Sequence, residues 1–191
     1  VTGGSIKIDG IDVRDFKIKS LRQKIGFIRQ KTLLFTGSIK SNIKFGKQEA
    51  SHDEVVESAK TAQAYDFISK KELKFDEPIG EGGSNVSGGQ KQRLSIARAL
   101  VRKPEIYIFD DSFSALDFKT DAILRAELKK ETADAIVLIV AQRIGSIMEA
   151  DKIIVLDEGK VVGCGKHKEL LKSCSVYKEI ALSQLTEEEL A

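Results

Sequence analysis

The stretch Ile106–Asp117, IYIFDDSFSALD, joins a short apolar run to a cluster of acidic and small polar residues. The apolar run is typical of a buried strand, and the carboxylates of Asp110 and Asp111 follow it at once. In α/β sheets, ligands gather at the carboxyl ends of the strands. A carboxylate there can hold Mg²⁺ directly or through water, and the next acidic group can orient an attacking water. Taken alone, the pair is more simply a solvated turn, so its interpretation depends on its surroundings.

Upstream of this strand, Ser84–Arg98 (SNVSGGQKQRLSIAR) predicts a helix start that can hold an anion. Ser87 is the expected N-cap, and Gln90 completes a Ser-x-x-Gln capping box. Gly88 and Gly89 stand between them, where side chains would keep a ligand away from the backbone N–H groups. These N–H groups and the positive end of the helix dipole favour phosphate. Together with this helix start, the acidic pair favours a functional interpretation.

The chain lacks the sequence that usually cradles the phosphates of a nucleotide, G-x-x-x-x-G-K-[ST]. Its Gly-Lys pairs begin at Gly46, Gly159 and Gly165, and none of them is followed by Ser or Thr. One half of a phosphate site is therefore present without the other.

Two glutamines follow other apolar strands. Gln30 comes after the expected strand Ile25–Ile28, and Gln142 follows Ala135–Val140. The second strand is apolar on both faces, as expected of a parallel strand covered by helices. The amide of Gln142 can hydrogen-bond a γ-phosphate but cannot carry a proton, whereas Gln30, taken alone, is more simply an exposed loop residue. Asp117 follows the acidic pair closely enough to lie beside it.

The remaining pattern alternates between strands and helices and indicates an α/β domain with a parallel sheet. The core is expected over residues 1–48 and 103–191, with an inserted helical subdomain over about 49–102. The other expected elements are a β-hairpin turning at Asp9-Gly10, helices at 53–67, 88–102, 120–132 (with Ile123, Leu124 and Leu128 inward) and 144–150, a loop at 69–86, strands at 152–156 and 161–162, two C-terminal helices, and a frayed acidic end at 186–191.

Composition limits the classes of partner. The 191 residues suit one domain, or one domain with a subdomain. A net charge of +2 gives no reason to propose a nucleic acid or an anionic membrane as partner, and no apolar run approaches the roughly 18 residues that span a bilayer. Cys164 and Cys174 are expected to be free thiols. His52 and His167 are expected at the surface rather than as ligands.

Five motifs occur in an order that resembles the nucleotide-binding domain of ABC transporters. They correspond to the Q-loop, signature motif, Walker B strand, D-loop and switch region, at Gln30, Ser87–Gln90, Ile106–Asp111, Ser114–Asp117 and Val140–Gln142. Each motif alone is weak, but their ordered occurrence over essentially the whole chain is specific. The resemblance implies a P-loop NTPase-like fold, ATP and Mg²⁺ as ligands, and ATPase activity in the complete protein.

In this family the signature helix caps the γ-phosphate of ATP held by the phosphate loop of a partner chain, which would explain the half site. The phosphate loop and the transmembrane helices are expected to precede Val1, so the chain by itself is expected to be inactive. The site residues that the resemblance implies are Asp110 and Gln30 for the metal, Asp111 and Gln142 for catalysis, and Gln30, Ser87, Gly88, Gly89, Gln90 and Asp117 for the nucleotide.

Two residues depart from the family pattern. The position after Asp110 usually holds Glu, and Asp111 is one methylene shorter. The switch position usually holds His, and Gln142 cannot be charged. A misplacement of about 1 Å can cost roughly a hundredfold in rate. An intact signature motif beside weak catalytic groups resembles the degenerate half of a heterodimeric bacterial ABC exporter, often of multidrug type.

Residues 34–43 and 79–83 are also similar to exporter-type domains, in which the second segment faces the coupling helices of the membrane domain. The resemblance therefore implies a place at the cytoplasmic face of the cell membrane, with a second half-transporter and the chain's own transmembrane domain as partners. One alternative is a soluble ABC-type ATPase or interaction module without a transmembrane partner. Another is an ABC protein of DNA repair or translation, which would show long insertions or tandem domains.

Overall fold

The computed structural model describes residues 3–186 and 188, and the chain forms two compact units that divide after Leu138. The first unit contains β1 (Lys7–Ile8), β2 (Ile11–Asp12), α1 (Ile18–Lys24), β3 (Ile25–Ile28), β4 (Gly37–Ser38), α2 (Ile39–Lys44), α3 (His52–Thr61), α4 (Tyr65–Ser69), β5 (Pro78–Ile79), α5 (Gly88–Leu100), β6 (Ile106–Asp110) and α6 (Phe118–Glu131). Strand β7 (Ile136–Val140) crosses the division, and the second unit contains β8 (Ile153–Asp157), β9 (Lys160–Gly165), α7 (His167–Ser173) and α8 (Ser175–Leu182). Single 3₁₀ turns lie at Val13–Asp15, Lys74–Asp76, Glu81–Gly83 and Ile144–Ser146.

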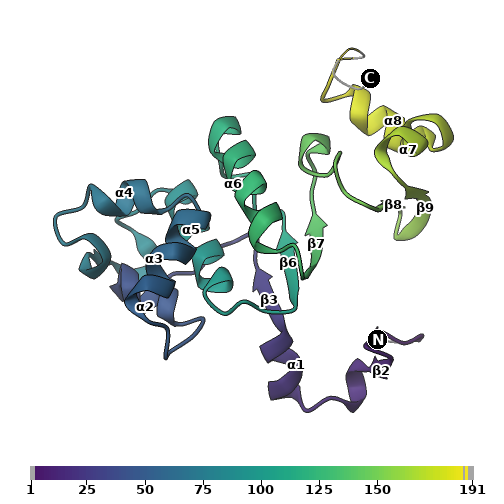
Figure 1. Ribbon diagram of the computed structural model, residues 1–191. Coiled ribbons are helices and arrows are strands. Elements are labelled where there is room, and N and C mark those ends of the chain that lie inside the picture. Colours follow the sequence, from purple (N-terminus) through teal and green to yellow (C-terminus); the bar gives the residue numbers. More distant parts are fainter. Residues whose placement is uncertain (1–2, 187, 189–191) are drawn as a thin grey trace. The chain divides into compact units, whose positions relative to one another are not determined.

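A three-stranded sheet in the order β3-β6-β7 carries the candidate site. Strands β3 and β6 are parallel, with Ile25 opposite Ile106 and Ile28 opposite Phe109 (Figure 1). The two strands therefore end at the same edge of the sheet. This confirms the predicted α/β fold with a parallel sheet.

The N-terminal hairpin is also confirmed. Strands β1 and β2 pair antiparallel, with Ile8 opposite Ile11. Asp9 and Gly10 form the two-residue turn, with φ angles of 51° and 80°. Two successive positive φ values match the twist of the flanking strands, which is why Asp-Gly favours this turn.

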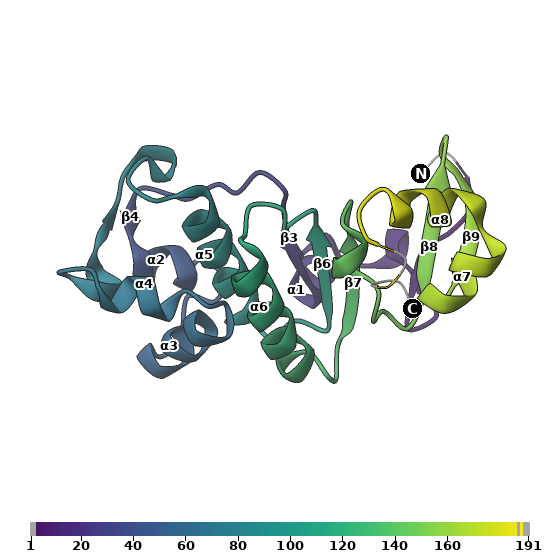
Figure 2. The same cartoon turned by 90° about the horizontal axis from the view of Figure 1, so that it is seen from above.

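Helices α2 to α5 pack together in the first unit (Figure 2). The predicted continuous helix over 53–67 is wrong, because α3 ends at Thr61 and α4 begins at Tyr65. Gln63 has a φ of 56°, the Gln63 N–H donates to the Lys60 carbonyl, and the Ala64 N–H donates to the Ala59 carbonyl. This pair of bonds is a Schellman motif, which ends a helix at a left-handed residue. The predicted boundary of a helical subdomain at 49 and 102 stays a prediction.

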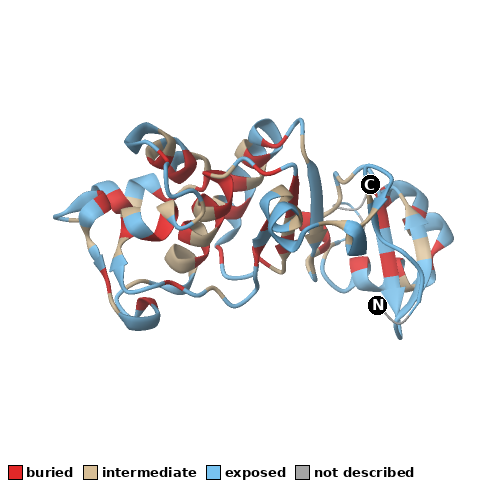
Figure 3. Cartoon of the chain, turned by 90° about the horizontal axis from the view of Figure 1, so that it is seen from below, coloured by how far each residue is buried: buried red, intermediate tan, exposed pale blue. Residues whose placement is uncertain are grey.

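Strand β7 is less buried than its sequence predicts. Ile136 is 60% exposed and Leu138 is 52% exposed. Figure 3 colours the whole chain by burial, and four of the five residues of β7 are in the exposed class. The strand lies at an edge of its sheet, with β6 as its neighbour. Its apolar pattern therefore shows that its faces can be buried, although this chain leaves most of them exposed. In α6, Leu124 and Leu128 are buried as predicted, but Ile123 is 43% exposed.

Two other predicted elements differ from the structure. The loop predicted over 69–86 contains the short strand β5, which pairs with β4 through Gly37 and Ile79. The helix predicted over 144–150 is only the 3₁₀ turn Ile144–Ser146. The frayed acidic end predicted over 186–191 lies mostly outside the described residues. Within residues 3–186 and 188, no helix is both long and apolar enough to cross a membrane.

The second unit packs one face of the β8–β9 hairpin against α7 and α8. Its buried cluster consists of Ile144, Ile153, Val155, Leu170, Cys174, Tyr177 and Ala181. Both cysteines are free thiols, as predicted, and His52 is exposed. The surface position predicted for His167 is wrong, because His167 is only 6% exposed. Its Nδ1 atom lies 2.7 Å from the hydroxyl of Tyr177, so the ring joins α7 to α8.

Candidate functional site

The ends of β3 and β6 bring Gln30 and Asp111 together. The Nε2 atom of Gln30 donates a hydrogen bond of 2.9 Å to Oδ2 of Asp111, across 81 positions of sequence. This contact fits the parallel register, since Asp111 comes directly after β6 and Gln30 is the second residue after β3. An amide and a carboxylate therefore share the carboxyl edge of the sheet, where α/β proteins bind ligands.

The turn after β6 holds Asp111 in an uncommon backbone conformation. Its φ is 43°, in the left-handed region that Asp enters more readily than most residues. Ser114 Oγ donates to the Asp111 carbonyl at 3.0 Å. The buried Ser112 donates from Oγ to the Ile28 carbonyl at 2.9 Å, which fastens the turn to the end of β3. Such over-determined backbone is typical of functional sites.

Gln30 and Asp110 suit Mg²⁺ by their donor atoms. Because Gln30 donates through Nε2, its Oε1 atom remains the acceptor of that amide. Asp110 ends β6 and supplies carboxylate oxygens, and Mg²⁺ prefers oxygen ligands. The described part of the chain contains no cluster of three or more His, Cys, Asp or Glu residues that could hold a metal. A Mg²⁺ at this edge would therefore take its other ligands from water and phosphate.

The start of α5 has the predicted capping box. The N–H of Gln90 donates to Ser87 Oγ at 3.3 Å, and Gln90 Oε1 accepts from the Ser87 N–H at 3.0 Å. A Cβ added at Gly88 would meet no atom within 4 Å, whereas one at Gly89 would lie 3.2 Å from the Ala115 carbonyl oxygen. Gly88 thus leaves one side of the helix start open to a ligand, and Gly89 allows the other side to lie close to the segment after β6.

Arg93 supports this helix start from one turn below, and the sequence reasoning missed it. Its Nε donates to the Gly89 carbonyl at 3.3 Å, and its Nη1 donates to the Gln63 carbonyl at 2.7 Å. The guanidinium lies 5.0 Å from the centroid of the Phe67 ring. Burial lowers the pKa of Arg93, while the charges of Asp117 and Asp66 oppose that shift. The sequence signal was its position four residues after Gly89, on the same face of the helix.

Asp117 acts in this structure as the N-cap of α6. Its Oδ1 accepts from the Thr120 N–H at 2.9 Å, and its Oδ2 accepts from Thr120 Oγ1 at 2.7 Å. Both hydrogen bonds hold the pKa of Asp117 below its ordinary value, and the bond from the Thr120 N–H has the larger effect. A contact between Asp117 and a nucleotide stays a prediction.

Gln142 belongs to the second unit, whereas the other candidate residues all lie in the first. Its backbone carbonyl accepts a hydrogen bond of 2.7 Å from Nε2 of Gln184. Its proximity to the nucleotide site therefore also stays a prediction.

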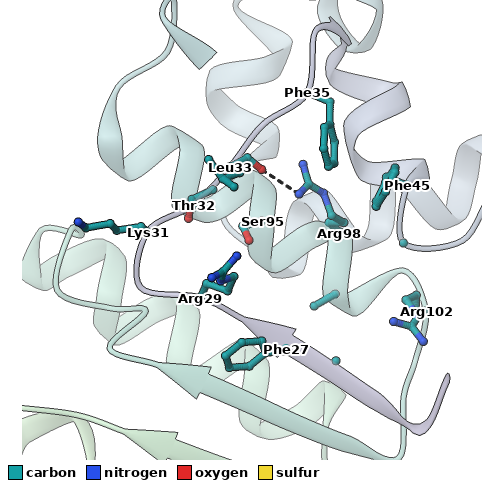
Figure 4. Close-up of a pocket in the computed structure, with 13 residues that line it drawn as sticks. Phe27, Arg29, Lys31, Thr32, Leu33, Phe35, Phe45, Ser95, Arg98 and Arg102 are labelled. Atoms are coloured by element: carbon teal, nitrogen blue, oxygen red, sulfur yellow. Dashed lines mark hydrogen bonds between the residues drawn. The ribbon is translucent and has the colours of Figure 1, made fainter. Parts of the chain in front are cut away.

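A pocket of about 290 Å³ lies between the segment after β3 and helix α5, and the sequence did not indicate it (Figure 4). The guanidinium of Arg98 lies 5.1 Å from the ring centroid of Phe35 and 5.8 Å from that of Phe45. It donates to the Leu33 carbonyl and to the carbonyl and Oδ1 of Asn42, each at 2.9 Å. Burial lowers the pKa of Arg98 to about 10, so it stays charged at neutral pH. The pocket therefore has a cationic wall and an aromatic rim.

The comparisons with known proteins decide the family. A family profile described as ABC transporter matches residues 1–114. The chain belongs to the ABC transporter family. It is 45% identical over 185 residues to an uncharacterized ABC transporter ATP-binding protein of Bacillus subtilis, covering 97% of this chain and 32% of that protein. It is 43% identical over 180 residues to a protein of Staphylococcus aureus whose name describes a multidrug export ATP-binding/permease protein, covering 94% and 31%.

A solved structure described as a bacterial Atm1-family ABC exporter with ATP bound matches with a TM-score of 0.91. The sequence identity is 37%, and the match covers 93% of this chain and 31% of that one. This ABC chain thus spans about a third of the length of the relatives it matches. The predicted family and fold are confirmed as those of an exporter-type ATP-binding domain.

Proposed function

We propose that the chain is the ATP-binding part of an ABC exporter, in which ATP binding and hydrolysis are coupled to transport across a membrane. The observation that carries this proposal is the hydrogen bond between Gln30 and Asp111 at the edge of the sheet. It joins the segments that follow β3 and β6, which carry the residues that we assign to Mg²⁺ and to the attacking water. The names of the Staphylococcus aureus relative and of the ATP-bound exporter support the same function.

The residues at this edge divide the chemistry between them. Asp110 and the Oε1 atom of Gln30 would hold Mg²⁺, which when bound neutralises phosphate charge. Asp111 would orient the attacking water through its carboxylate, and its release from Gln30 would free Oδ2 for that task. Because Asp is one methylene shorter than Glu, it holds a water less well at a distance set for Glu.

The open start of α5 would serve a second chain. The capping box occupies the side chains of Ser87 and Gln90 with local hydrogen bonds. The N–H groups of the first helical turn have no intrahelical acceptor, and they favour an anion. We assign them to the γ-phosphate of ATP bound by a second half-transporter. Weak catalytic groups beside an intact helix start favour a heterodimer in which this chain supplies the degenerate site.

The change Asp111→Asn tests that assignment. In the complete heterodimer we expect steady-state ATPase activity to fall by less than about twofold, because the partner's groups perform most of the hydrolysis. The matched control is the equivalent substitution in the partner, which should remove nearly all activity. A loss of activity with Asp111→Asn as complete as in that control would show that this chain is a working catalytic half.

The chain of 191 residues should bind ATP poorly and should not hydrolyse it. The motif that supplies the main phosphate contacts is absent from its sequence, and its own anion-binding helix start addresses another chain's nucleotide. Isothermal calorimetry with ATP and Mg²⁺ should detect no binding in the micromolar range. A dissociation constant of a few micromolar, about −7 to −8 kcal/mol, would contradict the proposal.

The pocket beside α5 favours a membrane partner over a soluble ATPase. Phe27, Leu33 and Phe45 expose apolar side chains along it, and the charged side chains that line it are cationic: Arg29, Lys31, Arg98 and Arg102. An apolar and cationic hollow suits a short helix with an acidic or carbonyl-rich end. We propose that a segment of the transmembrane domain docks there, at the cytoplasmic face of the membrane.

A further inference from the structure

The side-chain amide of Gln184 makes two hydrogen bonds to the backbone of the segment that carries Gln142. Its Nε2 donates to the Gln142 carbonyl at 2.7 Å, and its Oε1 accepts from the Ile144 N–H at 2.9 Å. These two backbone groups flank a single residue. A neighbouring parallel strand makes the same pair of bonds with its own backbone. The amide of Gln184 therefore replaces a strand neighbour at the point where β7 has ended.

Gln184 is itself fixed to the core of the second unit. Its N–H and that of Leu185 both donate to the Ala181 carbonyl, at 3.1 and 3.0 Å. Ala181 is fully buried, and Leu185 packs against the same cluster that contains Ile144. The residue that offers the amide and the segment that receives it thus rest on one core.

We propose that Gln184 is a positioning residue, which fixes the backbone at Gln142 so that its amide can meet a γ-phosphate. The inference rests on the proposed function and on the prediction, implied by the family resemblance, that Gln142 faces the nucleotide. The Gln184 amide supplies a donor and an acceptor on separate atoms, as its two backbone partners require. A loose switch segment would still bind the parts that ATP and ADP share, but it would lose the contact that only ATP offers.

Hydrogen–deuterium exchange of the complete protein tests the contact directly. With Gln184→Met, which keeps the length of the side chain but removes both polar atoms, the peptide containing Ile144 should exchange about tenfold faster, because the Ile144 N–H loses its acceptor. The control is Ser183→Ala, which removes the bond from Ser183 Oγ to the Ile180 carbonyl at the same helix end. It should leave that peptide unchanged.

Photolabelling of this subunit with azido-ATP tests the consequence. In competition, the concentration of ATP needed for half displacement should rise about tenfold with Gln184→Met, whereas that of ADP should change by less than about twofold, because a hydrogen bond to a charged phosphate is lost only for ATP. Gln184→Glu should behave in the same direction, since a carboxylate cannot donate to the Gln142 carbonyl.

Three results would overturn the proposal: unchanged exchange at Ile144, an equal loss of ATP and ADP affinity, or the same change with Ser183→Ala. Failure of the proposed function looks different. Wild-type protein would then take no label, while the exchange of the Ile144 peptide would still decide whether Gln184 holds the segment.

Discussion

Replacing Gly89 by Asp is expected to reduce ATP turnover of the complete exporter at least about a hundredfold. This is the usual cost of losing one hydrogen-bond donor to the charge that develops in the transition state. A Cβ at this position would lie 3.2 Å from the Ala115 carbonyl oxygen and 3.6 Å from Leu116. The helix start would therefore have to shift against the segment after β6. The new carboxylate would also add a negative charge to the first turn of the helix, whose N–H groups we assign to the γ-phosphate of the partner's ATP, and like charges repel strongly at a site shielded from water.

Two further substitutions separate the effect of charge from that of size. Gly89→Asn adds a side chain of the same shape without the charge, and Gly89→Ala adds only the Cβ. Steady-state ATPase activity should fall in the order Ala, Asn, Asp. Equal activity of the Asn and Asp variants would show that no anion approaches Gly89. Activity of the Asp variant above about a tenth of wild type would contradict a phosphate contact at this helix start.

Local signals predicted the parts of the site that depend on neighbouring residues in the chain. The capping box needs only Ser87 and Gln90 at the right spacing, and the hairpin needs only Asp9 and Gly10 between two short strands. The strands Ile25–Ile28 and Ile106–Asp110 were visible as apolar runs. Each of these signals depends on a few neighbouring residues, so tertiary packing did not change the local structure that they predict.

Contacts between distant residues were not predictable in the same way. The bond from Gln30 to Asp111 depends on the parallel register of β3 and β6, which no local pattern encodes. The break at Gln63 has neither Gly nor Pro to announce it, and one of the bonds there comes from the distant Arg93, which donates to the Gln63 carbonyl. The burial of His167 follows from a partner ten residues away, Tyr177.

The exposure of β7 shows a second limit of sequence patterns. Its residues are apolar on both faces, which correctly predicts a strand, but the pattern says nothing about which chain provides the cover. The outer face of the β8–β9 hairpin is similar, since Ile154, Leu156 and Val161 are exposed while Ile153 and Val155 are buried. Apolar strands thus indicate which faces can be buried, but not which residues bury them.

Replacing Arg98 by Met is expected to lower the free energy of unfolding by about 3 kcal/mol, because three hydrogen bonds from one charged group are lost at once. The carbonyls of Leu33 and Asn42 and the Oδ1 atom of Asn42 would lose this donor. Met can fill the space beside the rings of Phe35 and Phe45, but it offers no N–H group. The loss therefore reports the polar contacts rather than a cavity.

Urea unfolding followed by far-ultraviolet circular dichroism, at low protein concentration, measures this change. Arg98→Lys keeps the charge but has no planar fork, so it should recover less than half of the loss. Arg14→Met is the control for removing an arginine at the surface, since Arg14 is exposed and bonds to Asp12 and to the Gly4 carbonyl, both near it in the sequence, and it should leave the midpoint nearly unchanged. If Arg98→Met shifts the midpoint no more than Arg14→Met does, Arg98 does not organise the pocket. The pocket to which we assign a membrane partner would then be held in shape by other residues.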